Sequence, residues 1–344
     1  MKILSFIKKF IGIIGITLIA VIAGIFILLN SFFNGTSEKA KAVFATTFLE
    51  TGQLKFVVSM FLDDDEINKI VNGNSLKEMD AEVDSGLIVV DKENNGENIK
   101  IDKIVGDNFV ATMMTIKDPS TVSLATTHPW SQYGLELDKL VEKSNSVAGI
   151  NGGLYVSDSN KGGRPLGLAV SKGEILHLNA SGIKGLHLIG IDKNNILKII
   201  DLKGLSNDKV KKLIIDEEIR DAIAFQEEAT DKNNHFVKLI INGEKRELNG
   251  IGSGSNPRTA IGQKKDGSII FLVTDGRGAN GHLGASAHDL IEIMYDNGAV
   301  NAANLDGGSS STMYYKDKYL MPSVTLYYAN SSWKLPTAFV VGEK

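Results

Sequence analysis

The stretch NLDGGSSST, residues 304–312, places one carboxylate, two glycines and four small hydroxyl side chains directly after an apolar run that ends at Leu305. An apolar strand holds the residue at its end rigidly, and glycine lets the backbone adopt a positive φ or approach a ligand closely. A plain turn needs neither the acid nor the hydroxyl groups. The stretch therefore indicates a strand end that carries a functional loop.

The same pattern occurs at two other strand ends. Residues 147–150 lead into Asn-Gly-Gly at 151–153, and residues 269–274 lead into Asp-Gly-Arg at 275–277. Each segment alone is also typical of an ordinary hairpin turn. The three together predict loop tips that converge on one shared cavity.

Arginine is scarce in this chain, with five arginines against 32 lysines. Two of the five, Arg258 in NPRTAIG and Arg277 in DGRG, lie in glycine-rich or strand-edge contexts. The planar guanidinium pairs bidentately with a carboxylate or a phosphate, which lysine does not do. Two interpretations stay open: an oxyanion ligand, or pairing with a neighbouring acid such as Asp275 or Asp306.

The overall composition excludes several classes of protein. A chain of 344 residues that is 43% hydrophobic and 23% charged is typical of a globular protein with a sizeable core. Its formal net charge of -4 gives no basic footprint, so no nucleic-acid partner is expected. The absence of cysteine excludes disulfides, thiolate metal sites and cysteine nucleophiles.

The N-terminal region predicts a membrane anchor. Residues 10–29 form an uncharged apolar run, which is long enough for a bilayer core, and Lys2, Lys8 and Lys9 precede it. The positive-inside rule then predicts a single-pass protein of the cell membrane with a cytoplasmic N-terminus and everything after Asn30 extracellular. The alternatives are a cleaved signal peptide, whose apolar region is usually about 7–15 residues, and a buried pair of core helices.

The pattern of apolar and polar residues divides the whole chain into three units. Residues 1–30 form the cytoplasmic tip and signal anchor, residues 31–98 an extracellular linker with a helical segment, and residues 99–344 a catalytic domain. Within the linker, the acidic patch at 63–66 suits the first turn of a helix, where carboxylates interact favourably with the helix dipole.

Short apolar runs between Gly, Asn and Asp residues predict the strands of the third unit, for example 108–116, 146–150, 166–170 and 268–274. A helix should follow Ser286, with Asp289 completing a capping box, and another should cover 135–143. Strands without a regular βαβ alternation predict an α+β fold: a mixed β-sheet domain with inserted helices, preceded by one N-terminal transmembrane helix.

Five segments in this order resemble one known family: GINGGLY at 149–155, GRPLGLAVSKGEIL at 163–176, NPRTAIG at 256–262, FLVTDGR at 271–277 and NAANLDGGSSSTM at 301–313. They resemble the phosphodiester glycosidase family, which includes N-acetylglucosamine-1-phosphodiester alpha-N-acetylglucosaminidase and bacterial proteins labelled as related to exopolysaccharide biosynthesis. The resemblance covers about residues 99–344. The sequence departs from the family at Ser309, where a third glycine is frequent, and at Leu154, where phenylalanine is usual.

The resemblance implies a hydrolase that cleaves sugar 1-phosphodiester linkages in envelope glycans or exopolysaccharide. Asp306 would act at the anomeric carbon as nucleophile or as base for water, and Asp275 would be the second carboxylate. Arg258 and Arg277 would hold the phosphate. Other residues expected to bind substrate or line the pocket are Asn151, Gly152, Gly153, Gly307, Gly308, Ser310, Ser311, Thr312 and His282.

Several alternatives stay open at this point. No cofactor is expected, and a divalent cation such as calcium at the carboxylate pair is left open. The spacing of His282 and His288 matches no standard zinc motif, while His128 and Trp130 could either stack on a sugar or pack in the core. A non-catalytic glycan-binding or exopolysaccharide assembly factor could share the fold. So could a phosphodiesterase that cuts the bond between phosphorus and oxygen.

Overall fold

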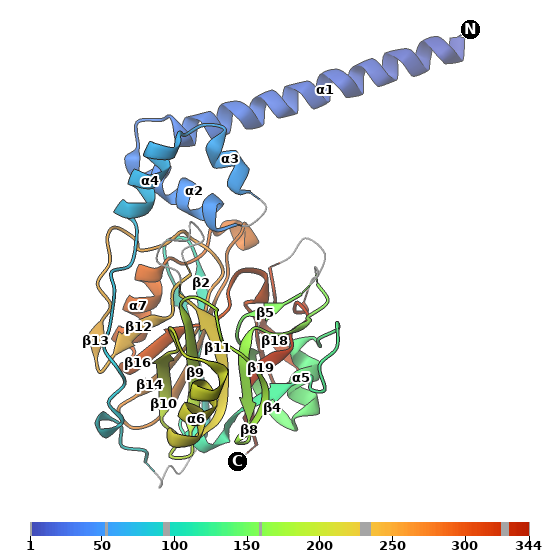
Figure 1. Cartoon of the computed structure of the whole chain (residues 1–344). Coiled ribbons are helices and arrows are strands. Elements are labelled where there is room, and N and C mark those ends of the chain that lie inside the picture. The colour runs from blue at the N-terminus through green and yellow to red at the C-terminus, as the bar shows by residue number, and fades with distance from the viewer. Residues whose placement is uncertain are drawn as a thin grey trace.

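The computed structural model of the chain describes residues 2–51, 54–91, 97–157, 160–227, 235–324 and 330–343, with the side chains of residues 2–5 left out. Within these ranges it contains seven α-helices (Figure 1). They are α1 (Lys2–Phe33), α2 (Glu38–Glu50), α3 (Lys55–Ser59), α4 (Asp64–Gly73), α5 (Leu137–Lys143), α6 (Asn207–Asp216) and α7 (Ala287–Asp296).

The strands form three large sheets and one small hairpin. In spatial order, the seven-stranded sheet is β1 (Ile99–Val105), β2 (Val110–Ile116), β15 (Ile269–Thr274), β14 (Thr259–Lys264), β16 (Ala299–Asn304), β12 (Lys238–Ile241) and β13 (Glu244–Lys245). One five-stranded sheet is β10 (Leu197–Asp201), β9 (Leu186–Asp192), β11 (Ile219–Gln226), β7 (Gly167–Ser171) and β8 (Glu174–Asn179). The other is β18 (Lys318–Met321), β17 (Met313–Tyr315), β4 (Ser146–Asn151), β19 (Thr337–Gly342) and β3 (Val122–Thr126), and the hairpin is β5 (Tyr155–Val156) with β6 (Arg164–Pro165).

The predicted α+β class is confirmed, and the sheet arrangement is more specific than expected. Each strand pairing between the described elements is antiparallel, and the strands are divided among several sheets instead of one mixed sheet. Hairpin-length loops between many of the strands allow this arrangement, because antiparallel neighbours need no long crossover. The helix after Ser286 is confirmed, with both halves of its capping box formed.

The three large sheets share one hydrophobic core. Along β15, Ile269, Phe271 and Val273 point into this core, while Ile270 and Leu272 pack on the opposite face. Because successive side chains of a strand point to opposite faces, an uninterrupted apolar run means that both faces are covered. Each large sheet has one helix on its outer face: α7 covers the seven-stranded sheet, α6 the sheet containing β9, and α5 the sheet containing β4.

The antiparallel register explains why segments that are distant in sequence meet at one end of the seven-stranded sheet. β14 lies between β15 and β16, and its residue Ala260 pairs with Leu272 on one side and Asn304 on the other. The start of β14 therefore lies beside the ends of both neighbours. This brings Asp275 and Asp306 to the same end of the sheet as Arg258, so two of the three predicted loop tips lie together, while the shared cavity stays a prediction.

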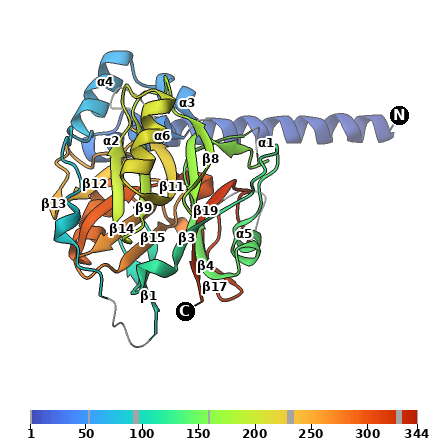
Figure 2. The same cartoon turned by 60° about the horizontal axis from the view of Figure 1, so that its bottom comes forward.

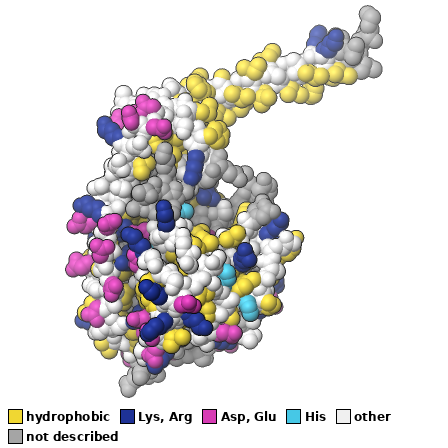
Figure 3. All heavy atoms as spheres, viewed as in Figure 1, with side chains coloured by type: hydrophobic (Ala, Val, Ile, Leu, Met, Phe, Trp, Pro, Cys, Tyr) yellow, Lys and Arg dark blue, Asp and Glu magenta, His cyan; other side chains and the backbone are white. Residues whose placement is uncertain are grey.

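The N-terminal helix α1 projects away from the rest of the molecule (Figures 1 and 2). Its segment Phe6–Phe33 is long and apolar enough to cross a membrane, by length and composition. Apolar side chains lie exposed along it, as Figure 3 shows. These properties fit the predicted anchor and a signal sequence alike.

Helices α2, α3 and α4, which we call the helical cap, pack against the end of α1 and on the β domain. Phe33 of α1 is fully buried among cap side chains such as Leu49, Val58 and Ile67. The acidic patch opens α4 as expected, with Asp63 accepting a hydrogen bond from the Glu66 amide.

Residues 76–91 then run along the β domain. Leu76 pairs with Leu248 in a β-bridge, and the Val89 amide donates to the Lys265 carbonyl. The described part of the expected linker is thus packed on the domain, while the boundaries of the three units stay a prediction.

Gly152 and Gly153 lie where the chain passes between two sheets. A side chain at Gly152 would overlap Thr337 of β19, and one at Gly153 would overlap the carbonyl oxygen of Ala224 in β11. Neither glycine has a positive φ. Close packing between backbones therefore requires glycine at both positions.

We predict that Gly153→Ala lowers the free energy of unfolding of the full chain by about 1–3 kcal/mol, because the added methyl group forces β4 and β11 apart. Thermal and urea unfolding in detergent would measure the loss. Gly73→Ala is the matched control, since a methyl group there meets nothing within 4 Å. Equal stability of the two variants would contradict this explanation of Gly153.

Candidate active site

Asp306 follows β16 and begins the glycine and serine loop. Its side chain is partly buried, and removal from water raises the pKa of its carboxyl group to about 6. The Ser310 hydroxyl, the Gly307 amide and the Arg277 guanidinium act in the opposite direction and favour the carboxylate. A carboxylic acid with a pKa near neutrality can exchange protons at physiological pH.

Arg277 lies against the same loop and remains open to solvent. Its Nη1 donates to Ser309 Oγ at 2.9 Å, and its Nε donates to Asn256 Oδ1 at 3.4 Å. Gly308 has a φ of 62°, and a side chain on it would lie 2.6 Å from Arg277 Nη2. The positive φ favours glycine at 308, and the guanidinium lies in the space that a side chain there would take. Ser309, the departure from the family pattern, is a partner of this arginine.

Asp275 faces a histidine. The carboxylate is 6% exposed; its Oδ1 accepts from the Val110 amide at 2.8 Å, and its Oδ2 lies 2.7 Å from His282 Nδ1. A proton on Nδ1 would donate to the carboxylate and leave Nε2 as an acceptor. The pair resembles the arrangement in which a carboxylate orients a general base. The histidine was expected as a substrate contact, and its pairing with Asp275 also suits it to proton transfer.

Asn151 ties three segments together from inside the protein. The side chain has no exposed surface. Its Nδ2 donates to the Asp306 carbonyl at 2.7 Å, while its Oδ1 accepts from Thr259 Oγ1 at 2.7 Å and from the Thr312 amide at 3.1 Å. This placement favours a structural role for Asn151 over the expected contact with sugar hydroxyls.

The expected amide donors are also largely engaged within the protein. The Gly152 amide donates to the Thr337 carbonyl at 3.1 Å, and the Gly308 amide donates to the Pro257 carbonyl at 2.8 Å. Gly307 has an extended backbone, and its amide contacts the Asp306 carboxylate. These groups hold the loop in place around Asp306.

The hydroxyl residues of the loop have different surroundings. Ser310 contacts the Asp306 carboxylate and lies 3.2 Å from the Tyr155 hydroxyl. Thr312 is fully buried and donates to the Met321 carbonyl at 2.9 Å. Ser311 is 2% exposed, and its hydroxyl has no hydrogen-bond partner within the described ranges. Only the first of these three hydroxyls contacts the acid.

Tyr155 was not identified from the sequence. Burial raises the pKa of its hydroxyl well above the ordinary value, and the negative charge of Asp306 acts in the same direction. The phenol therefore stays protonated next to the Asp306 and Ser310 pair. The residue lies inside the GINGGLY segment, but nothing in its local pattern indicates that its hydroxyl reaches the loop after β16.

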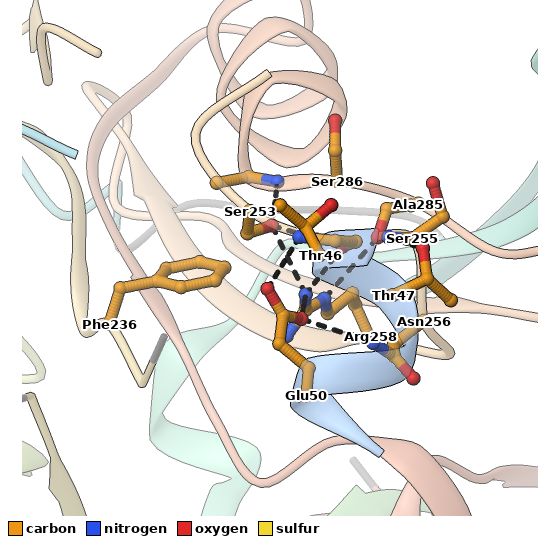
Figure 4. Close-up of polar contacts among 12 residues, drawn as sticks. Thr46, Thr47, Glu50, Phe236, Ser253, Ser255, Asn256, Arg258, Ala285 and Ser286 are labelled. Carbon is orange, nitrogen blue, oxygen red and sulfur yellow. Dashed lines mark hydrogen bonds and ion pairs between the residues drawn. The ribbon is translucent and has the colours of Figure 1, made fainter. Parts of the chain in front are cut away.

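Arg258 does not face the same space as Arg277. It is 8% exposed, and its Nη2 lies 2.6 Å from Glu50 Oε2 of α2 (Figure 4). The same nitrogen donates to the Gly254 carbonyl at 2.7 Å, and the guanidinium carbon lies 5.1 Å from the centre of the Phe236 ring. Of the two interpretations of this arginine, pairing with an acid is the one observed, and the acid is Glu50.

Trp130 and His288 contact groups of the protein itself. Trp130 packs against the core and its Nε1 donates to the Leu176 carbonyl at 3.0 Å. His288 is half-exposed on α7, 3.8 Å from a carboxylate oxygen of Glu292. No three His, Asp or Glu side chains in the described part of the chain are close enough to hold a metal ion.

Comparisons with known proteins show the family and the fold of the chain. The family model for phosphodiester glycosidase matches residues 144–342. The SPbeta prophage-derived protein YomE of Bacillus subtilis (strain 168) is 24% identical over 246 residues, which are 65% of this chain and 35% of that protein. This chain therefore spans about a third of the length of that relative.

A solved structure shows the same fold. The catalytic domain of zebrafish N-acetylglucosamine-1-phosphodiester alpha-N-acetylglucosaminidase, described as auto-inhibited by its pro-peptide, is 20% identical with a TM-score of 0.57. The match covers 74% of this chain and 87% of the zebrafish chain. The family match spans more than half of the present sequence and includes Asn151, Arg258, Asp275 and Asp306. The chain belongs to the phosphodiester glycosidase family.

Proposed function

We propose that this protein is a hydrolase that cleaves sugar 1-phosphodiester linkages. The observation that carries the proposal is the placement of the exposed Arg277 against the loop that Asp306 begins, where Arg277 donates to Ser309 and its charge acts on the Asp306 carboxyl group. One group suits chemistry at the anomeric carbon, and the other suits a phosphate. The family match supports activity of this type.

The proposed reaction breaks the bond between the anomeric carbon and the phosphate oxygen. A phosphate leaves readily as an anion, so stabilisation of its charge matters more than protonation. Arg277, which donates hydrogen bonds to Ser309 and Asn256, would supply that charge. Asp306 would either attack the anomeric carbon or activate water, and retention or inversion of the anomeric configuration would separate these two roles.

The Asp275 and His282 pair would handle protons in this scheme. His282 Nε2 is the free nitrogen if Nδ1 donates to Asp275, so it could accept a proton from water or from a substrate hydroxyl. Tyr155 and Ser310 would hold the Asp306 carboxylate in one orientation. Arg258 would contribute to the structure of the site and not to phosphate binding.

We further propose that α1 anchors the protein in the cell membrane, with the N-terminus in the cytoplasm and the catalytic domain outside. The apolar length of α1 and the lysines that precede it support this orientation. The substrates would then be phosphodiester-linked glycans of the envelope or exopolysaccharide.

Asp306→Asn should lower hydrolysis of a nitrophenyl sugar phosphodiester by at least about 10³-fold, because an amide neither attacks nor accepts a proton efficiently. Release of free sugar by the full chain in detergent is the measurement. Asp317→Asn, a change at an exposed acid in the β17–β18 turn, is the matched control and should keep full activity. Full turnover by Asp306→Asn would remove this residue from the chemistry.

The same reaction in ¹⁸O-labelled water identifies the bond that is broken. We expect the label in the sugar, because water would add at the anomeric carbon. Label in the phosphate would instead indicate a phosphodiesterase that attacks phosphorus. Binding of several sugar phosphodiesters without release of any product would favour the glycan-binding alternative.

The pH dependence of kcat/KM should follow the titration of Asp306. The deprotonated form is the active one, and its pKa is raised, so activity should be lost as the pH falls through about 6. An ordinary aspartate would keep its charge down to about pH 4. A lower limb near pH 4 in the wild-type profile would contradict this assignment.

A further inference from the structure

Glu50, the last residue of α2, reaches from the helical cap into the wall of the candidate site. Its carboxylate is 3% exposed and contacts three groups on the segment before β14: the Gly254 amide, Asn256 Nδ2 at 3.1 Å and Arg258 Nη2 at 2.6 Å (Figure 4). A carboxylate with this many donors is held in one place. No local pattern in the sequence indicates this role, because residues 50 and 258 are far apart along the chain.

The end of α2 contacts the backbone of this segment directly. A side chain at Gly254 would lie 2.6 Å from backbone atoms of Thr46 and Thr47. The Ser255 amide donates to Thr47 Oγ1 at 3.0 Å. The helix end and residues 253–256 are therefore packed without a gap.

Asn256 connects Glu50 to Arg277. Its Nδ2 donates to Glu50 Oε2 at 3.1 Å, and its Oδ1 accepts from Arg277 Nε at 3.4 Å. A carboxylate can only accept hydrogen bonds, so it selects the amide orientation in which Nδ2 faces Glu50. That orientation turns Oδ1 toward the guanidinium, which can only donate.

The charges of Glu50, Arg258 and Arg277 also link the helical cap to Arg277. Arg258 lies close enough to Arg277 for the two positive charges to repel each other. The buried carboxylate of Glu50 compensates the charge of Arg258. Without Glu50, the buried positive charge of Arg258 would have no acid partner, which would destabilise the protein. The uncompensated charge would also repel Arg277 more strongly.

We propose that Glu50 is a positioning residue that fixes the Arg277 guanidinium through the Asn256 amide, so that the helical cap is part of the candidate active site. The inference rests on the proposed function only for the role of Arg277 toward phosphate. Glu50 itself contacts no substrate in this scheme.

The test uses three variants of the full chain in detergent. Glu50→Gln removes the charge and the obligatory acceptor, and Asn256→Ala removes the connecting amide while it leaves the Glu50 and Arg258 pair in place. Thr47→Val is the matched control, because it removes a different hydrogen bond between α2 and the same segment.

Two readouts follow Arg277. The first is the Nε–H signal of Arg277 in the ¹⁵N spectrum, which is sparse because the chain has five arginines and can be assigned with Arg277→Lys. We expect this signal to shift in Glu50→Gln and Asn256→Ala and to stay in place in Thr47→Val. The second is the dissociation constant for inorganic phosphate, which should rise about tenfold in the first two variants only.

The outcomes separate this inference from the proposed function. An unchanged Arg277 signal in Asn256→Ala, or an equal shift in Thr47→Val, would overturn the positioning role even in an active enzyme. Higher activity of Glu50→Gln would also overturn it, because the cap would then obstruct the site. Absence of hydrolysis by the wild type would refute the proposed function, while the spectrum would still decide the inference. The variant Asn256→Ala keeps the test decisive if Glu50→Gln does not fold.

Discussion

The buried amide of Asn151 is the interaction on which the arrangement of the site depends. Its hydrogen bonds join the end of β4, the start of β14 and the loop after β16, which belong to two different sheets. A buried amide with broken hydrogen bonds costs free energy, so the three segments are stable only in this mutual position. This contact also fixes the position of Asp306, because the Asn151 side chain donates a hydrogen bond to the Asp306 carbonyl oxygen.

Around this contact, the chain separates two kinds of charge. Glu50 and Arg258 form a compensated pair in the interior, while Arg277 stays open to solvent beside Asp306. The two arginines look alike in the sequence and differ in their surroundings. A buried ion pair holds the surrounding segments in place. An accessible guanidinium next to a carboxyl group of raised pKa can instead interact with a ligand.

The sequence predicts a strand such as β15 well, because both of its faces are buried and its apolar run is continuous. It also predicts that the acid at 306, the glycines around it and Arg277 lie together, since polar residues followed by glycine recur at several strand ends. It does not reveal what each glycine is for. Gly308 is favoured by a positive φ, whereas Gly152 and Gly153 are required by close contacts with backbone atoms of neighbouring strands. Tyr155 and Glu50 could not be found either, because their roles depend on contacts across about 155 and 208 residues of sequence.

The junction between α1 and α2 has a mechanical consequence. α1 ends at Phe33 and α2 begins at Glu38, so only four residues connect them, and both helix ends are packed. A connection of this length allows little movement between the two helices, in contrast to the long flexible linkers of many surface enzymes. With α1 held in a bilayer, the β domain would stand at a nearly constant height and tilt. Under the proposed function, any substrate would then have to reach a thin layer at a fixed distance above the lipid.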